Sequence, residues 1–133
     1  MTIQEIDLFE KVQTQLEGMY NEISILSKKS QNDGVSLFKL KFINDILLNS
    51  NKILGNTYKP FQDFETFDEN SIPTNSDVAM ILTQYLNCFE KLRADNIFSD
   101  EYYNGNKYEN QWLWIIEGDN NKKIKTSEPK KIK

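Results

Sequence analysis

The most regular pattern in this chain is a seam of apolar residues near the N-terminus, spaced alternately by three and four positions. This spacing is typical of a long amphipathic helix that packs against other helices. Thr2 and Glu5 form a capping-box pattern at its start, and Lys28 and Lys29 suit the negative end of the helix dipole. We therefore predict a helix from about Ile3 to Lys28. The seam comprises Phe9, Val12, Leu16, Met19, Ile23 and Leu26.

Two further helices are predicted from the same kind of periodicity. The second opens near Ser36 and closes at Gly55, and its apolar positions cover more than one stripe, so we expect it to be the central and most buried helix. The third begins at Thr74 or Asn75 and continues at helical spacing to Asp95. The chain should therefore be mainly α, with a three-helix bundle as its body.

After the third helix the period changes to that of a β-hairpin. We predict strands over Ile97–Tyr103 and Lys107–Glu117, joined at Asn104-Gly105, because Asn-Gly is the preferred pair for a type I′ turn. Both faces of the second strand are apolar, so one should cover the helices while the other needs a partner or stays partly exposed. A helix over residues 109–117 is the competing interpretation.

The residues that follow the hairpin differ from the rest in composition. We expect one domain over residues 1–119 and a disordered, lysine-rich tail over residues 120–133. Residues 1–121 hold ten basic and nineteen acidic groups, a net charge of −9, whereas residues 122–133 hold six lysines and Glu128, a net charge of +5. The body is therefore strongly acidic and the tail is a short basic arm.

The composition excludes several classes of function. The 133 residues include no histidine and one cysteine, which removes the usual general base, any Ser-His or Cys-His nucleophile pair, and an ordinary zinc site. The glycines match no nucleotide-binding motif. No apolar run reaches the length of a membrane span and the N-terminal region is acidic, so we expect a cytoplasmic protein. We predict no catalytic residue, metal or cofactor.

One segment, residues 56–74, combines aromatic and acidic side chains, and we call it the acidic aromatic segment. The spacing of its phenylalanines permits one or two helical turns with the rings on one side and the carboxylates on the other. We therefore predict an ordered loop with a short helical turn. Aromatic anchors within a polar rim are typical of protein interfaces. The candidate binding residues are Phe61, Asp63, Phe64, Glu65, Phe67, Asp68 and Glu69, together with Trp112 and Trp114 of the hairpin.

Other interpretations of these residues stay open at this point. The phenylalanines could close the open end of the helical core, and one tryptophan is expected in the core as well. The carboxylates of the segment could bind Mg²⁺ or act as a general acid and base, although such groups are more often a solvated or partner-facing surface.

The tail lysines give an alternative function. Clustered lysines neutralise phosphates and release counterions, so the tail could bind nucleic acid. The acidic body and the single arginine argue against this, and a solubilising tail is the simpler interpretation. The residues concerned are Lys122, Lys123, Lys125, Lys130 and Lys131.

Our leading interpretation is a small non-enzymatic interaction protein, such as an inhibitor, an antitoxin or immunity-type protein, or an accessory subunit. Its partner would be a protein with a basic surface, because the body is acidic. We also expect a homodimer, since the first helix is longer than the other two helices could cover.

Overall fold

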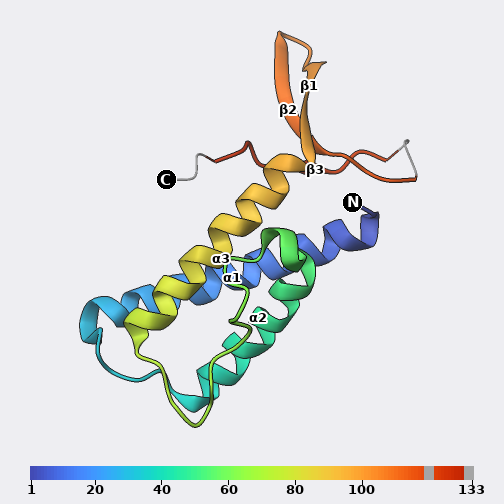
Figure 1. Cartoon of the computed structure of the whole chain (residues 1–133). Helices are drawn as coiled ribbons and strands as arrows, with labels where there is room; N and C mark the ends of the chain where they lie inside the picture. The colour runs from blue at the N-terminus through green and yellow to red at the C-terminus, as the bar shows by residue number, and fades with distance from the viewer. Residues whose placement is uncertain (119–121, 131–133) are drawn as a thin grey trace.

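The computed structural model describes residues 1–118 and 122–130, and it confirms a mainly helical chain (Figure 1). Three packed helices, α1 (Ile3–Ser30), α2 (Leu37–Tyr58) and α3 (Asn75–Asp95), precede a small antiparallel sheet. Its strands are β1 (Ile97–Tyr103), β2 (Tyr108–Trp114) and β3 (Lys125–Thr126), in the spatial order β1-β2-β3. The β1–β2 hairpin continues from the end of α3 and projects beyond the helices (Figure 1).

The helix starts follow the predicted caps. The Thr2 hydroxyl accepts a hydrogen bond from the Glu5 N–H at 3.1 Å, and the Glu5 carboxylate accepts one from the Thr2 N–H at 3.0 Å. The Thr74 hydroxyl accepts from the Asp77 N–H at the start of α3. The second helix was predicted to end at Gly55. Gly55, with φ of +62°, does interrupt the regular helix, but one more turn follows it and α2 ends at Tyr58.

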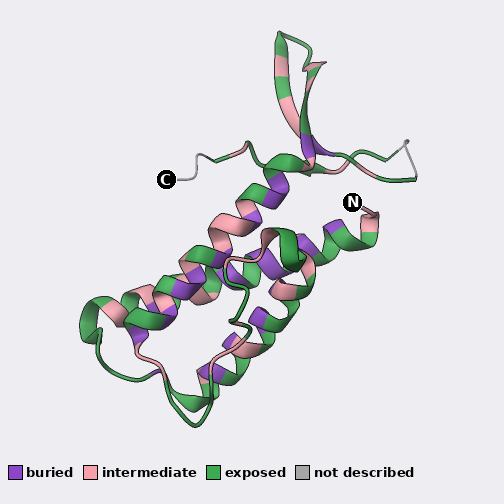
Figure 2. Ribbon diagram, in the orientation of Figure 1, coloured by how far each residue is buried: buried purple, intermediate pink, exposed green. Residues whose placement is uncertain are grey.

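The core lies mainly between α1 and α3, which contact each other more extensively than either contacts α2. Buried residues form one line along each helix (Figure 2). The prediction that the second helix is the most buried is wrong, because its two neighbours cover only one side of it. Four of its apolar side chains are exposed, namely Leu37, Phe38, Phe42 and Leu48.

The hairpin is confirmed, although β2 ends at Trp114 and not at Glu117 as predicted. The strand excludes the competing helix over residues 109–117. The turn differs from the prediction: Tyr103 is opposite Tyr108, so four residues, 104–107, form the loop. A type I′ turn needs positive φ at both central residues, and here only Gly105 has it, at +100°. The Asn104 side-chain oxygen instead accepts hydrogen bonds from the N–H groups of Asn106 and Lys107.

Part of the predicted disordered tail forms the third strand. Lys125 is opposite Leu113 and Thr126 is opposite Trp112, and the Trp114 N–H donates to the Ile124 carbonyl at 3.0 Å. The prediction of disorder from residue 120 is therefore wrong for this strand. The physical reason that the tail packs here is the second apolar face of β2, where Leu113 is buried. The tail residues 120, 121 and 131–133, including Lys131, lie outside the described residues.

Within residues 1–118 and 122–130, no helix is both long enough and apolar enough to cross a membrane.

Candidate functional site

The acidic aromatic segment is confirmed as a loop. Its residues 56–58 belong to the last turn of α2, and from residue 59 on it runs along α2 (Figure 1). The predicted helical turn over its phenylalanines is wrong, because the backbone there bonds to α2. The Asn44 side-chain amide donates to the Phe67 carbonyl at 3.0 Å, while the Phe67 N–H donates to Asn44 Oδ1 at 2.9 Å. This pair of hydrogen bonds takes the place of helical bonds at Phe67 and fixes the loop against α2.

A second asparagine holds the loop at Glu65. The Asn51 amide donates to the Glu65 carbonyl at 3.0 Å, and the Tyr85 hydroxyl of α3 donates to Asn51 Oδ1 at 2.6 Å. Burial raises the pKa of Tyr85 to about 12, so its hydroxyl remains protonated and can donate near neutral pH. Asn44 and Asn51 are seven residues apart, or about two helical turns, and therefore lie on the same side of α2.

The phenylalanines of the loop contribute mostly to packing. Phe64 and Phe67 are half-buried against the core, with ring centroids 5.1 Å apart, and Phe64 also lies 6.5 Å from the ring of Tyr85. Phe61 is more exposed, at 37%. The interpretation that these rings close the core is thus supported for Phe64 and Phe67.

The carboxylates of the loop divide into two groups. Asp68 and Glu69 line an open groove of about 550 Å³ between the loop and α2, which we call the acidic groove. Asp63 and Glu65 are exposed but do not line it. The complete lining is Lys41, Asn44, Asp45, Leu48, Thr66, Phe67, Asp68, Glu69 and Asn70.

The structure does not bring these carboxylates together as a set of metal ligands. In the part of the chain that it describes, no group of three or more aspartate, glutamate, cysteine or histidine residues is placed to hold a metal ion. The groove instead offers spaced negative charges, from Asp45, Asp68 and Glu69, around one lysine, Lys41. Such an arrangement suits the cationic side chains of a macromolecule.

Two aromatic residues of the helix that was expected to be the most buried lie on the side of α2 that contributes Lys41 and Asp45 to this groove. Phe38 and Phe42 of α2 are 73% and 50% exposed, and their rings meet edge to face with centroids 5.0 Å apart. Lys41 is three residues after Phe38, and Asp45 is three residues after Phe42, so each charged residue lies about one helical turn from a ring on the same exposed side. The sequence feature that could have identified Phe38 and Phe42 as exposed is that α2 has more apolar residues than one stripe needs. We call the side of α2 that carries Leu37, Phe38, Phe42 and Leu48 the α2 outer face.

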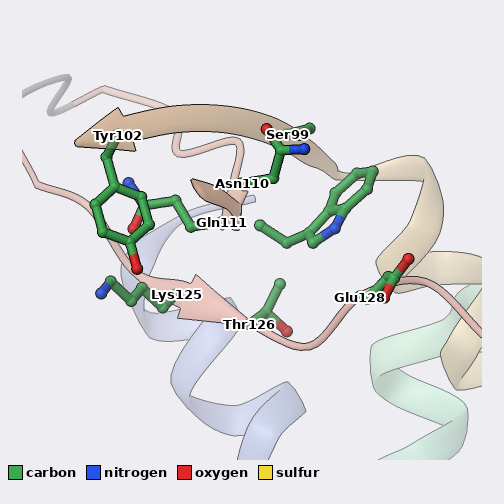
Figure 3. A pocket seen from close by; sticks show the side chains of 8 residues that line it. Ser99, Tyr102, Asn110, Gln111, Lys125, Thr126 and Glu128 are labelled. Atoms are coloured by element: carbon green, nitrogen blue, oxygen red, sulfur yellow. The ribbon is translucent and has the colours of Figure 1, made fainter. Parts of the chain in front are cut away.

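The two tryptophans belong to the sheet and do not line the acidic groove. Trp114 is 2% exposed, packs edge to face on Phe9 at 5.0 Å, and donates its indole N–H to Glu10 at 2.8 Å. It is a core residue. Trp112 is half-buried, is opposite Ser99 on one side and Thr126 on the other, and lines a depression of about 540 Å³ on the sheet. Figure 3 shows Ser99 and Thr126 in the lining of this depression.

The described tail lysines lie close to groups of the body. Lys123 is 3.9 Å from the Asp100 carboxylate, and the Lys125 ammonium lies 5.5 Å from the ring centroid of Tyr102. Lys130 lines a cavity with the carboxylates of Glu17 and Glu90, whereas Lys122 is exposed. Part of the tail charge is therefore directed at this chain's own acidic and aromatic side chains.

Comparison with known proteins found no family model, no curated protein and no solved structure that matches this chain.

Proposed function

We propose that this protein is a non-enzymatic protein-binding module that engages a basic segment of a partner protein through the α2 outer face and the acidic groove. The observation that carries the proposal is the exposed pair Phe38 and Phe42 on the same side of α2 as Lys41 and Asp45. These two charged residues line the acidic groove together with Asp68 and Glu69. Aromatic side chains at the centre of an interface, surrounded by polar groups, supply most of the affinity of many protein complexes.

The support of this surface favours binding without large rearrangement. Phe38 and Phe42 lie on a regular helix, and the loop that forms the other wall is fixed by Asn44 and Asn51. A preorganised surface loses less conformational entropy when a partner binds. The backbone on both sides of the proposed binding surface is therefore already held in place.

The charge of the chain favours a basic partner. Residues 1–121 carry a net charge of −9, and the groove itself has three carboxylates against one lysine. A basic partner would be attracted before contact, and an acidic one repelled. The roles that fit are those of an inhibitor, an antitoxin or immunity-type protein, or an accessory subunit.

The homodimer was expected because the apolar stripe of α1 is longer than the other two helices could cover. Ile6, Phe9 and Leu16 of α1 are all completely buried within one chain, where Phe9 packs on Trp114 of the sheet. Self-association stays a prediction that light scattering at micromolar concentration can test.

The experiment that tests the proposed function is affinity capture from the cells that encode the protein, using matched variants. A Phe38→Ser, Phe42→Ser double variant removes the aromatic pair, and Asp68→Lys with Glu69→Lys reverses the groove charge. Ile25→Ser is the control, since Ile25 is 56% exposed on α1. Each variant is first checked for native unfolding behaviour in urea.

We expect the wild-type protein and the Ile25→Ser control to capture the same basic protein. Both double variants should retain it at least about tenfold less well, as truncation of a central anchor or reversal of an interfacial charge does. Equal capture by the two double variants and the control would contradict the proposal.

A further inference from the structure

A second surface, independent of α2, is the outer edge of the projecting hairpin. β1 is the terminal strand of the sheet, and among the described residues it pairs only with β2 (Figure 1). From Phe98 to Tyr103 every residue is exposed or half-buried (Figure 2). A two-stranded ribbon is only marginally stable in water by itself, so the projecting part of this hairpin would gain from a further strand.

The pairing pattern shows which backbone groups of β1 are open. The Trp114 N–H points to β3, where it donates to the Ile124 carbonyl, and Trp114 is opposite Ile97. Because the Trp114 N–H points away from β1, Ile97 and Trp114 are a pair that exchanges no hydrogen bonds. Along an antiparallel ladder such pairs alternate with pairs that do exchange hydrogen bonds. The N–H and C=O groups of Ile97, Ser99, Glu101 and Tyr103 therefore point away from β2, towards the open edge.

The side chains along this edge select against a second copy of the chain. Asp100 and Glu101 lie at the middle of β1, so antiparallel pairing of two β1 edges would place carboxylates opposite or next to one another. Like charges directly opposite are destabilising, and charged edges are a common device against self-pairing. A strand with basic side chains would instead be attracted by these carboxylates.

The chain's own tail shows that the hairpin attracts basic groups. The Lys125 ammonium lies over the ring of Tyr102, and Lys123 is 3.9 Å from the carboxylate of Asp100 (Figure 3 shows Tyr102 and Lys125). Both lysines come from the segment that contains β3, which pairs with β2 at the other edge of the same sheet.

We propose that the β1 edge accepts an extended strand, rich in lysine or arginine, from a partner protein. The added strand would be the fourth of the sheet and would pair with the open backbone groups of Ser99, Glu101 and Tyr103. Its side chains would cover Phe98 on one face, which is 44% exposed, and Tyr103 on the other, which is 59% exposed. The proposal does not depend on the α2 outer face.

The test uses a fluorescently labelled peptide, Lys-Thr-Lys-Val-Lys-Thr-Lys, with blocked ends, and a control peptide with glutamate at each lysine position. Ser99→Pro removes an N–H from the open edge without changing charge, and proline is tolerated at such edge positions. Asn110→Pro is the matched control, because Asn110 is opposite Glu101 and its N–H points to the other edge of the hairpin.

We expect saturable binding of the lysine peptide by fluorescence anisotropy and slower amide exchange at Ser99, Glu101 and Tyr103. Ser99→Pro should weaken binding at least about tenfold, whereas Asn110→Pro should change it less than about twofold. The Phe38→Ser, Phe42→Ser variant should bind the peptide normally, which separates this result from that for the proposed function.

A second pair of variants keeps the test decisive if proline disturbs the hairpin. Glu101→Lys should weaken binding of the lysine peptide, while Glu17→Lys makes the same charge change on the exposed side of α1 and should have little effect. No saturable binding, equal binding of the glutamate peptide, or equal losses in both charge variants would overturn the proposal. So would a dimer that dissociates in Ser99→Pro, since it would assign the edge to a second copy.

Discussion

Asn44→Ala tests the hydrogen bonds that hold the acidic aromatic segment against α2. The Asn44 amide is the only side chain of the described residues that bonds to both the N–H and the C=O of Phe67, at 2.9 and 3.0 Å. Alanine keeps the helix propensity of α2 high and removes both bonds, so any loss of stability comes from the loop contact.

The expected cost follows from the two bonds. A protein hydrogen bond contributes a net of about 0.5 to 1.5 kcal/mol, and Phe67 is half-buried, so its freed backbone groups are only partly resolvated. We therefore expect the free energy of unfolding to fall by about 2 kcal/mol. With a urea dependence of roughly 2 kcal/mol per molar for a small domain, the midpoint should shift by about 1 M.

The assay is urea unfolding combined with amide hydrogen exchange. The matched control is Asn49→Ala, since Asn49 is exposed on the same helix. The Phe67 N–H should exchange much faster in Asn44→Ala than in the wild-type protein, and its exchange rate should be unchanged in Asn49→Ala. A stability difference below about 0.5 kcal/mol between the two variants, with unchanged exchange at Phe67, would refute the role of Asn44 in fixing the groove.

Three further predictions concern the core, the groove and pH. Trp114→Ala should lower the free energy of unfolding by roughly 3 to 5 kcal/mol in urea, because the buried ring leaves a cavity; a loss below about 1 kcal/mol would contradict its place in the core. Phe64→Ala should cost roughly 2 to 3 kcal/mol because Phe64 is half-buried, whereas Asp68→Lys with Glu69→Lys should change stability by less than about 1 kcal/mol, both measured in urea. The raised pKa of Tyr85, about 12 against an ordinary 10.0, means that folding favours the neutral phenol. Its contribution is complete below pH 10 and is lost as pH rises towards 12, so the urea midpoint should fall over this range in the wild-type protein and fall less in Tyr85→Phe.

Local signals in the sequence predicted the helices well. The Thr2 and Glu5 capping pair and the Thr74 cap each depend on neighbouring residues, and both are confirmed. Gly55 breaks the regular helix where the end was predicted, but α2 continues to Tyr58. The Asn104-Gly105 pair located the hairpin turn but not its type, because Asn104 bonds to the backbone through its side chain and keeps negative φ. Neighbouring residues thus predict where a helix starts more reliably than they predict the type of a turn.

The errors came from features that depend on which surfaces meet. Periodicity showed that α2 has more than one apolar stripe, but it could not show that α1 and α3 would pack together and leave Phe38 and Phe42 exposed. The same limit applies to the acidic aromatic segment, where spacing allowed a helical turn that the distant Asn44 replaces with side-chain bonds. β3 was missed because two residues carry no periodicity of their own.

The central claim is that the α2 outer face beside the acidic groove contacts a basic partner protein. It is tested most directly by replacing Phe42 with the photocrosslinking residue p-benzoylphenylalanine in living cells and identifying the adducts by mass spectrometry. The same replacement at Ile25, which is also exposed but lies on α1, is the control. We predict a single basic protein crosslinked from position 42, absent from position 25 and lost when Asp68→Lys and Glu69→Lys are added. No adduct from position 42, or the same adducts from both positions, would contradict the account.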